Sequence, residues 1–280
     1  MPLFLGIDGG GTGCRAAVAD ARGRILGRGK AGPANIVTDP DGARANILAA
    51  TVAALGSHGS PNDLHAVLGL AGANLPAYGA RLLQGLPFAS ARIESDAVIA
   101  LKGALRDVDG VVATIGTGSV FAVQQAGLFR TIGGWGLILG DEASGAWLGR
   151  ALLSAVLHAV DGLRPMTPLL QAVLKDAGGA DALVDYARTA PPSGFASHVP
   201  RLLEAAEDPA AMEILAAADG WIIRSIDLLR GPLSLPVTFL GGLGAVFADR
   251  LYSRYRDMVR APLGTALDGA LWLALKETAA

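Results

Sequence analysis

The sequence predicts an α/β protein built from two similar halves, and three observations support this prediction. A short apolar segment at residues 3–7 runs into a glycine-rich stretch and then into a second apolar segment. The same order of strand, Gly/Thr turn and strand returns at residues 111–123. Stretches with the length and periodicity of helices follow each of these units. With 280 residues, the chain is long enough for two domains.

The first half reads as a β-meander followed by alternating helices and strands. A helix is expected over residues 42–55, with Asp41 at its N-cap, because an Asp side chain accepts hydrogen bonds from the first free backbone N–H groups. A buried strand at residues 66–71 follows, and a helical pattern begins at Asp96. The three strands of the meander are expected at residues 3–7, 14–20 and 25–29.

The second half contains a longer helical region, from Ala143 to about Arg230. A strand at residues 237–240 follows it and leads into a glycine turn and a helix. We expect an N-terminal domain over residues 1–106, a C-terminal domain with a helical insertion over 107–264, and a last helix within 265–280 that packs back on the first domain.

Charge and cysteine content exclude several classes of protein. There are 23 basic and 25 acidic residues and no Lys/Arg run, so the chain lacks the basic excess that a nucleic-acid backbone demands. A single cysteine, Cys14, excludes an intramolecular disulfide, a Cys-rich zinc site and an iron–sulfur cluster held by one chain. The four histidines show no metal-ligand spacing. The sequence shows no signal peptide and no apolar run that spans a bilayer, which predicts a cytoplasmic protein.

The stretch Asp8–Gly13 carries the clearest chemical signal. A glycine run after a strand lets the backbone approach a phosphate and present its N–H groups as donors. Thr12 adds a hydroxyl donor, and Asp8 is positioned to hold Mg²⁺ directly or through water, because that ion prefers oxygen ligands. The alternative is a tight glycine turn capped by an Asp.

Other phosphate-binding motifs fit the sequence less well. The spacing of the dinucleotide fingerprint occurs from Gly11 and again from Gly27, but strands follow where that fingerprint needs a helix. No Gly-Lys-Ser/Thr sequence is present, which excludes a Walker A loop. Phosphate binding would therefore use hairpin turns.

Several different short motifs follow one another along nearly the whole chain in a characteristic order. They are Gly6–Thr12, Gly32–Asn35, Leu68–Ala73, Ser95–Ala97, Ile115–Ser119, Gly133–Gly136, Leu139–Gly145 and Leu240–Leu243. With this order and spacing, the sequence resembles the BadF/BadG/BcrA/BcrD-type ATPase family of the actin/hexokinase superfamily. Within that family it resembles the N-acetylglucosamine kinases and glucosamine kinases. One departure is Ala143, where the family more usually has glycine.

The resemblance implies an actin-like ATPase (ribonuclease H-like) fold, with two similar domains flanking a nucleotide and sugar cleft. It also implies ATP and Mg²⁺ as cofactors. The phosphate-binding residues would be Gly9, Gly10, Gly11, Thr12, Gly116, Thr117, Gly118 and Ser119. Gly241, Gly242 and Leu243 would border the adenosine, although from the residues alone Gly241–Gly242 fits a plain strand-to-helix turn equally well.

Asp96 is the candidate catalytic residue. A carboxylate beside a sugar hydroxyl can accept its proton as the phosphoryl group is transferred. From the residues alone, a helix cap is the better interpretation of Asp96. The resemblance reverses this preference, because the catalytic aspartate of the family aligns with Asp96.

The resemblance places the sugar among polar side chains and one aromatic ring. Hydroxyl groups need polar partners, and the apolar face of a sugar packs on an aromatic or glycine surface. The candidates are Asn35, Gly134, Trp135 and Asp141. Asn35, Trp135 and Asp141 also have ordinary structural interpretations, as a turn residue, a half-buried ring and a helix-start acid respectively. For Glu142 the ligand and structural interpretations are equally supported.

The expected function is an ATP-dependent kinase that phosphorylates an amino sugar, N-acetylglucosamine or glucosamine, with the family suggesting O6 and a homodimer. An alternative within the same fold is an ATPase that activates a partner enzyme, but such activators use cysteines to hold an iron–sulfur cluster. A regulatory nucleotide-binding module could dispense with Asp96 and with residues 133–145, which are present. A dehydrogenase would rest only on the fingerprint spacings.

Overall fold

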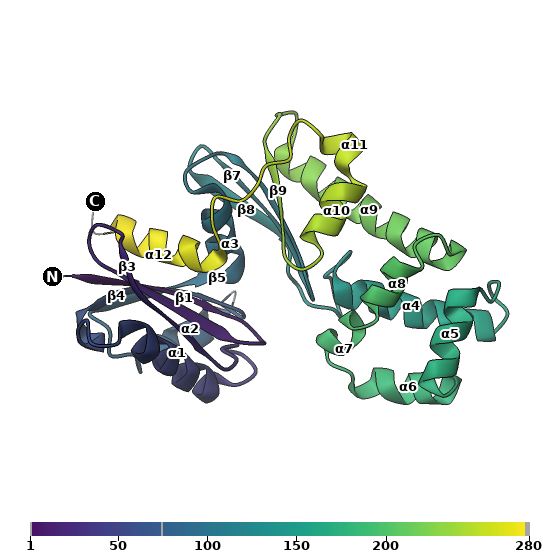
Figure 1. Ribbon diagram of the computed structural model, residues 1–280, viewed down its shortest axis with the longest axis horizontal. Coiled ribbons are helices and arrows are strands. Elements are labelled where there is room, and N and C mark those ends of the chain that lie inside the picture. Colours follow the sequence, from purple (N-terminus) through teal and green to yellow (C-terminus); the bar gives the residue numbers. More distant parts are fainter. Residues whose placement is uncertain (1, 74, 278–280) are drawn as a thin grey trace. The chain divides into compact units, whose positions relative to one another are not determined.

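The computed structural model describes residues 2–73 and 75–277 (Figure 1). It has a mixed α/β architecture with two sheets, which confirms the predicted fold class. The chain forms two compact units. Unit 1 comprises Met1–Asp109, Gln124–Leu128 and Ala261–Ala280, and unit 2 comprises Gly110–Val123 and Phe129–Arg260.

The sheet of unit 1 has the strand order β3-β2-β1-β4-β5. The first three strands form the expected meander of antiparallel pairs, while β4 and β5 run parallel to β1. The strands are β1 (Leu3–Gly9), β2 (Cys14–Ala19), β3 (Ile25–Ala31), β4 (Leu64–Leu70) and β5 (Ser90–Ser95).

Alternation along β1 supplies both faces of this sheet with apolar side chains. Leu5 and Ile7 belong to the apolar cluster that includes residues of helix α1, whereas Phe4 belongs to the cluster on helix α12. The helices of unit 1 are α1 (Pro40–Leu55), the 3-10 turn η1 (Pro61–Asp63), α2 (Pro76–Leu83), α3 (Asp96–Leu105) and α12 (Ala266–Glu277).

Helix α1 begins earlier than the sequence predicted. Its N-cap is Asp39, whose Oδ1 accepts a hydrogen bond from the backbone N–H of Gly42 at 3.0 Å. The prediction that Asp41 is the cap is therefore wrong. Pro40 can occupy the first helical position because the backbone N–H that proline lacks would have no intrahelical partner there. Asp41 lies in the first turn instead.

Helix α12 packs closely on β1 and α3 (Figure 1). A Cβ atom added to Gly6 of β1 would lie 2.5 Å from the backbone nitrogen of Leu271. A Cβ atom added to Gly269 would overlap the carbonyl oxygen of Ile99, and one added to Gly103 would overlap that of Thr265. Glycine at these three positions therefore permits close approach of the backbones.

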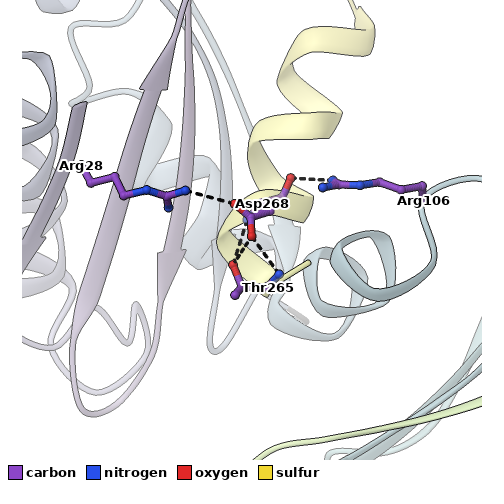
Figure 2. Close-up of polar contacts among 4 residues, drawn as sticks. All are labelled: Arg28, Arg106, Thr265 and Asp268. Carbon is purple, nitrogen blue, oxygen red and sulfur yellow. Dashed lines mark hydrogen bonds and ion pairs between the residues drawn. The ribbon is translucent and has the colours of Figure 1, made fainter. Parts of the chain in front are cut away.

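Polar contacts fix the start of α12, as Figure 2 shows. The backbone N–H of Thr265 donates to Oδ2 of Asp268 at 2.9 Å, and the backbone N–H of Asp268 donates to Oγ1 of Thr265 at 3.2 Å. This reciprocal arrangement is a capping box. Arg28 forms an ion pair with the Asp268 carboxylate, and Arg106 donates to the Asp268 carbonyl at 2.8 Å.

The sheet of the second half has the order β8-β7-β6-β9, and β9 runs parallel to β6. Its strands are β6 (Gly110–Ile115), β7 (Ser119–Gln125), β8 (Leu128–Gly133) and β9 (Val237–Leu240). Apolar side chains of β6 form a core with residues of α4 and α9. No helix in the described part of the chain is long and apolar enough to span a membrane.

The expected helical region after Ala143 is present. The helices of unit 2 are α4 (Gly145–Val160), α5 (Pro168–Ala177), α6 (Ala180–Thr189), α7 (Pro192–Ala196), α8 (Val199–Glu204), α9 (Pro209–Arg230), α10 (Gly244–Arg250) and α11 (Tyr252–Tyr255).

Candidate active site

Two candidate carboxylates of unit 1 lie at the same edge of its sheet. In the register of the parallel strands, Gly9 pairs with Leu70, and Leu70 pairs with Ser95. Asp8 lies directly before Gly9, and Asp96 lies directly after Ser95. Strands β1 and β5 are separated by two interstrand spacings, about 10 Å. The parallel topology therefore brings the proposed metal ligand and the proposed base to one edge of the sheet.

The glycine loop between β1 and β2 is anchored on one side and open on the other. The backbone N–H of Gly10 donates to the Gly13 carbonyl at 2.9 Å, and the Gly10 carbonyl accepts from Ala34 at 2.9 Å. A Cβ atom added to Gly10 or Gly11 would meet no described atom within 4 Å. Gly11 and Thr12 are exposed. The loop thus presents backbone to open space, as a phosphate site requires.

Arg15 is a residue of this region that the sequence interpretation missed. It lies opposite Asp8 in the β1–β2 register, and its Nη2 is 2.8 Å from Oδ2 of Asp8. The Asp8 side chain is 14% exposed and that of Arg15 is 59% exposed. Burial raises the pKa of Asp8, and the Arg15 guanidinium opposes this rise. The hairpin register is the signal that could have identified Arg15.

The donor set of unit 1 fits a magnesium ion held mainly by water and phosphate oxygens. Asp8 supplies carboxylate oxygens beside the glycine loop. Within residues 2–73 and 75–277, no three His, Cys, Asp or Glu side chains gather as a metal-binding group. Mg²⁺ is commonly bound through one or two carboxylates together with substrate phosphates, so a larger cluster is not needed.

Asn35 lies next to the glycine loop. Its Oδ1 accepts hydrogen bonds from the backbone N–H groups of Val37 at 3.0 Å and Thr38 at 3.3 Å, which fixes the side chain in a local turn. The preceding residue, Ala34, is the one that donates to Gly10. Because its oxygen already accepts these bonds, the side-chain NH₂ of Asn35 is the group suited to donating to a ligand.

Asp96 is the first residue of α3, but it is not the cap. The N-cap is Ser95, whose Oγ accepts a hydrogen bond from the backbone N–H of Val98 at 3.2 Å. Oδ1 of Asp96 accepts from Ala97 at 2.9 Å, and Asp96 is exposed. The structural interpretation of Asp96 as the helix cap is therefore wrong.

The second predicted phosphate loop, Gly116–Ser119, links β6 to β7 in unit 2. The backbone N–H of Gly116 donates to the Gly118 carbonyl at 2.9 Å, which forms a tight turn. The N-terminus of α4 supports this turn, because Gly145 donates to the Gly116 carbonyl at 2.7 Å and Ala146 donates to the Thr117 carbonyl at 3.1 Å. Thr117 is exposed. The loop is thus held from behind by a helix start.

The predicted sugar residues of unit 2 adjoin this loop. The backbone N–H of Gly134 donates to the Ser119 carbonyl at 2.9 Å. The Asp141 carboxylate, on a residue that is only 8% exposed, accepts from the backbone N–H of Gly136 at 3.1 Å. Trp135 is 71% exposed, so its ring is accessible in unit 2.

The backbone near Asp141 explains the glycine that is usual in the family at position 143. Ala143 has a φ of 66°, in the left-handed region where a residue with a Cβ atom is strained and glycine is favoured. Asp141 has a φ of 56°. This segment therefore carries two unfavourable conformations that the surrounding contacts maintain.

The predicted adenosine turn also adjoins the second phosphate loop. The backbone N–H of Leu243 donates to the carbonyl of Ile115 at 2.9 Å. Gly241 has a φ of 84°, and a Cβ atom there would overlap the same carbonyl. Gly242 is exposed. Unit 2 thus brings together the loop at 116–119, the turn at 133–136 and the turn at 241–243.

A separate cavity of about 280 Å³ lies between α4 and α9. Its lining includes Trp147, His158, Arg164 and Glu213, and it contains none of the predicted site residues. The predicted loops lie instead at strand ends.

Comparisons with known proteins identify the family of the chain. A model of the BadF/BadG/BcrA/BcrD ATPase family matches residues 5–260. A glucosamine kinase of Vibrio cholerae, GspK, is 32% identical over 284 aligned positions, which cover 99% of this chain and 97% of the relative.

Solved structures extend the comparison. A structure from Chromobacterium violaceum, provisionally named an N-acetylglucosamine kinase, is 31% identical and superposes with a TM-score of 0.89, covering 98% of this chain and 99% of that one. A glucokinase of the ROK family from Streptomyces griseus, at 18% identity and a TM-score of 0.58, covers 97% and 98% and shares the fold. The chain is a member of the BadF/BadG/BcrA/BcrD ATPase family and has the actin-like fold expected of it.

Proposed function

We propose that this protein is an ATP-dependent kinase that phosphorylates an amino sugar, N-acetylglucosamine or glucosamine, at its 6-hydroxyl. The observation that carries the proposal is the similarity to a glucosamine kinase along 99% of the chain. The positions of the candidate residues support it further, because each predicted loop lies at a strand end with exposed backbone or an exposed side chain.

Asp96 is the proposed general base. It is exposed at the edge of the sheet where Asp8 and the first glycine loop also lie. A sugar hydroxyl is a poor nucleophile at neutral pH, and a carboxylate within hydrogen-bonding reach can take its proton as the phosphoryl group is transferred. Because Ser95 already caps α3, Asp96 is not required for that role.

The nucleotide is assigned to the glycine turns. We assign the phosphates to Gly9, Gly10, Gly11 and Thr12 of unit 1 and to Gly116, Thr117, Gly118 and Ser119 of unit 2. The exposed residues Gly11, Thr12 and Thr117 are the ones placed to donate backbone N–H or hydroxyl groups, because the N–H groups of Gly10 and Gly116 and the Ser119 hydroxyl already donate within the protein. Gly241, Gly242 and Leu243 are assigned to the adenosine. Asp8 would hold Mg²⁺ directly or through water, and the bound ion would neutralise charge on the phosphates.

The sugar is assigned to residues that adjoin these loops. The side-chain NH₂ of Asn35 can donate to a hydroxyl, and the exposed ring of Trp135 offers an apolar face. Gly134 and Asp141 complete the assignment in unit 2. The family resemblance further supports a homodimer, and we propose that the protein acts in the cytoplasm. Sedimentation analysis of the purified protein tests the dimer.

The direct test is ADP release measured with MgATP against glucosamine, N-acetylglucosamine, N-acetylmannosamine and glucose. Turnover that depends on one of the two proposed amino sugars supports the proposal and identifies the substrate. ATP hydrolysis that no sugar changes contradicts it and favours an ATPase that acts on a partner protein. Omitting Mg²⁺ from the same assay tests the metal requirement.

A further inference from the structure

The Asp141 carboxylate lies between two functional segments of unit 2. On one side, its Oδ1 accepts the hydrogen bond from the Gly136 backbone, which belongs to the proposed sugar-binding turn at 133–136. Only 8% of the residue is exposed. A buried carboxylate needs several hydrogen bonds, so its partners are held firmly in place.

The other side of the carboxylate faces the proposed phosphate loop at 116–119. A Cβ atom added to Gly118 would lie 2.8 Å from Oδ2 of Asp141, so the loop backbone packs directly on the carboxylate. Burial raises the pKa of Asp141, and hydrogen bonding from the backbone of Gly136 and Ser119 opposes this rise. A separate hydrogen bond, from Gly134 to the Ser119 carbonyl, joins the same two segments.

The conformation of this segment indicates that its geometry is specifically maintained. Among the residues that the structure describes, four non-glycine residues have a positive φ, and two of them are Asp141 and Ala143. Such a conformation is unfavourable for a residue that carries a Cβ atom. Surrounding contacts must offset this cost, and the hydrogen bonds of Asp141 are among those contacts.

We infer that Asp141 is a positioning residue that couples the sugar-binding turn to the phosphate-binding loop, so that sugar and nucleotide strengthen each other's binding. This inference rests on the proposed function. A sugar that orders the turn around Gly136 also orders the carboxylate, and the carboxylate orders the backbone of Gly118–Ser119. Coupling between two binding equilibria is reciprocal, so the nucleotide must favour the sugar by the same factor.

The test measures this factor by calorimetry, using the non-hydrolysable analogue AMPPNP with Mg²⁺ and the amino sugar that supports turnover. For the wild-type protein, we expect saturating sugar to lower the Kd of AMPPNP by about fivefold or more. In Asp141→Asn, an NH₂ group takes the place of one carboxylate oxygen: it either loses the hydrogen bond from Gly136 or replaces the oxygen that packs against Gly118. The factor should then fall to about one.

A second variant examines the same contact from the loop. Gly118→Ala places a methyl group against the carboxylate and should also abolish the coupling, although it alters no residue of the sugar-binding turn. Asp161→Asn removes an equal charge at the far end of α4 and should retain the wild-type factor. Thermal unfolding of each variant shows that the fold is retained.

The outcomes separate this inference from the proposed function. If no sugar binds to the wild-type protein, the proposed function fails. If sugar and AMPPNP both bind to the wild-type protein without affecting each other, the inference is overturned. The inference is also overturned if Gly118→Ala keeps the full coupling. This holds even if Asp141→Asn has lost sugar binding, because Asp141 would then act only as a direct ligand of the sugar.

Discussion

Arg15 and Asp8 form an ion pair at 2.8 Å across the β1–β2 hairpin, directly beside the glycine loop. Because Asp8 is only 14% exposed, its carboxylate depends on Arg15 for charge compensation when no metal or nucleotide is bound. The pair therefore holds the Asp8 carboxylate, which is proposed to bind Mg²⁺, in place before the metal and the nucleotide bind.

Replacing Arg15 by alanine should lower the free energy of unfolding by about 1 kcal/mol, since a largely buried carboxylate loses its partner while the exposed arginine is screened by water. Urea unfolding without nucleotide measures this change. Arg22→Ala, an exposed arginine in the turn after β2, is the control and should have little effect. Equal losses in the two variants would contradict a specific role of the pair.

Asp268 should stabilise the protein in a way that depends on pH. Burial tends to raise the pKa of Asp268, but hydrogen bonds from Thr265 and the charge of Arg28 outweigh it and hold the pKa below its ordinary value. The folded state therefore binds this proton less readily than the unfolded state. The stabilisation is present above the ordinary pKa of an Asp carboxyl and is lost as the pH falls through the lowered value.

Asp268→Ala removes the capping box of α12 and should cost about 1 kcal/mol at pH 7. Chemical unfolding of the variant and the wild-type protein at pH 7 and at pH 3 checks this effect. The difference between the two proteins should be smaller at pH 3. A difference that stays constant or grows at the lower pH would show that the carboxylate charge is not involved.

Close packing at Gly269 should make it intolerant of a side chain. Gly269→Ala would force the added methyl group against the Ile99 carbonyl, and overpacking of this kind costs about 1–3 kcal/mol. Gly220→Ala is a matched change within α9, where the added Cβ would meet only the end of the Arg224 side chain at 3.6 Å. That variant should be stabilised by about 0.5–1 kcal/mol.

The midpoints of thermal unfolding of these two glycine variants should move in opposite directions from that of the wild-type protein. If both midpoints rise, the approach of α12 to α3 is less close than described.

Cys14 should be chemically inert in the folded protein. Burial raises the pKa of its thiol to about 12, and the residue is 1% exposed. Because the thiolate is the reactive species, a thiol reagent should label almost no native protein at pH 8. One thiol per chain should react after unfolding in urea. Rapid labelling of the native protein would contradict the described burial.

The motifs that depend on local backbone chemistry could be predicted from the sequence. The glycine runs at 9–11 and 241–242 lie in turns at strand ends, because a glycine run after an apolar segment permits few other structures. The fold class followed from the same alternation of strands, turns and helices.

Features that depend on register or tertiary contacts could not be predicted in the same way. The pairing of Arg15 with Asp8 requires the strand register, and the burial of Asp141 requires the loop around Gly118 to be in place. The N-caps of two helices also lie one or two residues away from the positions that the sequence suggests. Ser95 rather than Asp96 caps α3, and Asp39 rather than Asp41 caps α1, because neighbouring residues of similar capping ability compete.

Replacement of Asp96 by asparagine tests the central claim most directly. With MgATP and the preferred amino sugar, we expect kcat to fall by about 10²–10⁴-fold, because the general base is lost while its size is kept. The Kd of AMPPNP should change little, and Asp41→Asn, an exposed acid on α1, should retain wild-type kcat. Full activity of Asp96→Asn would contradict the assignment of Asp96 as the base.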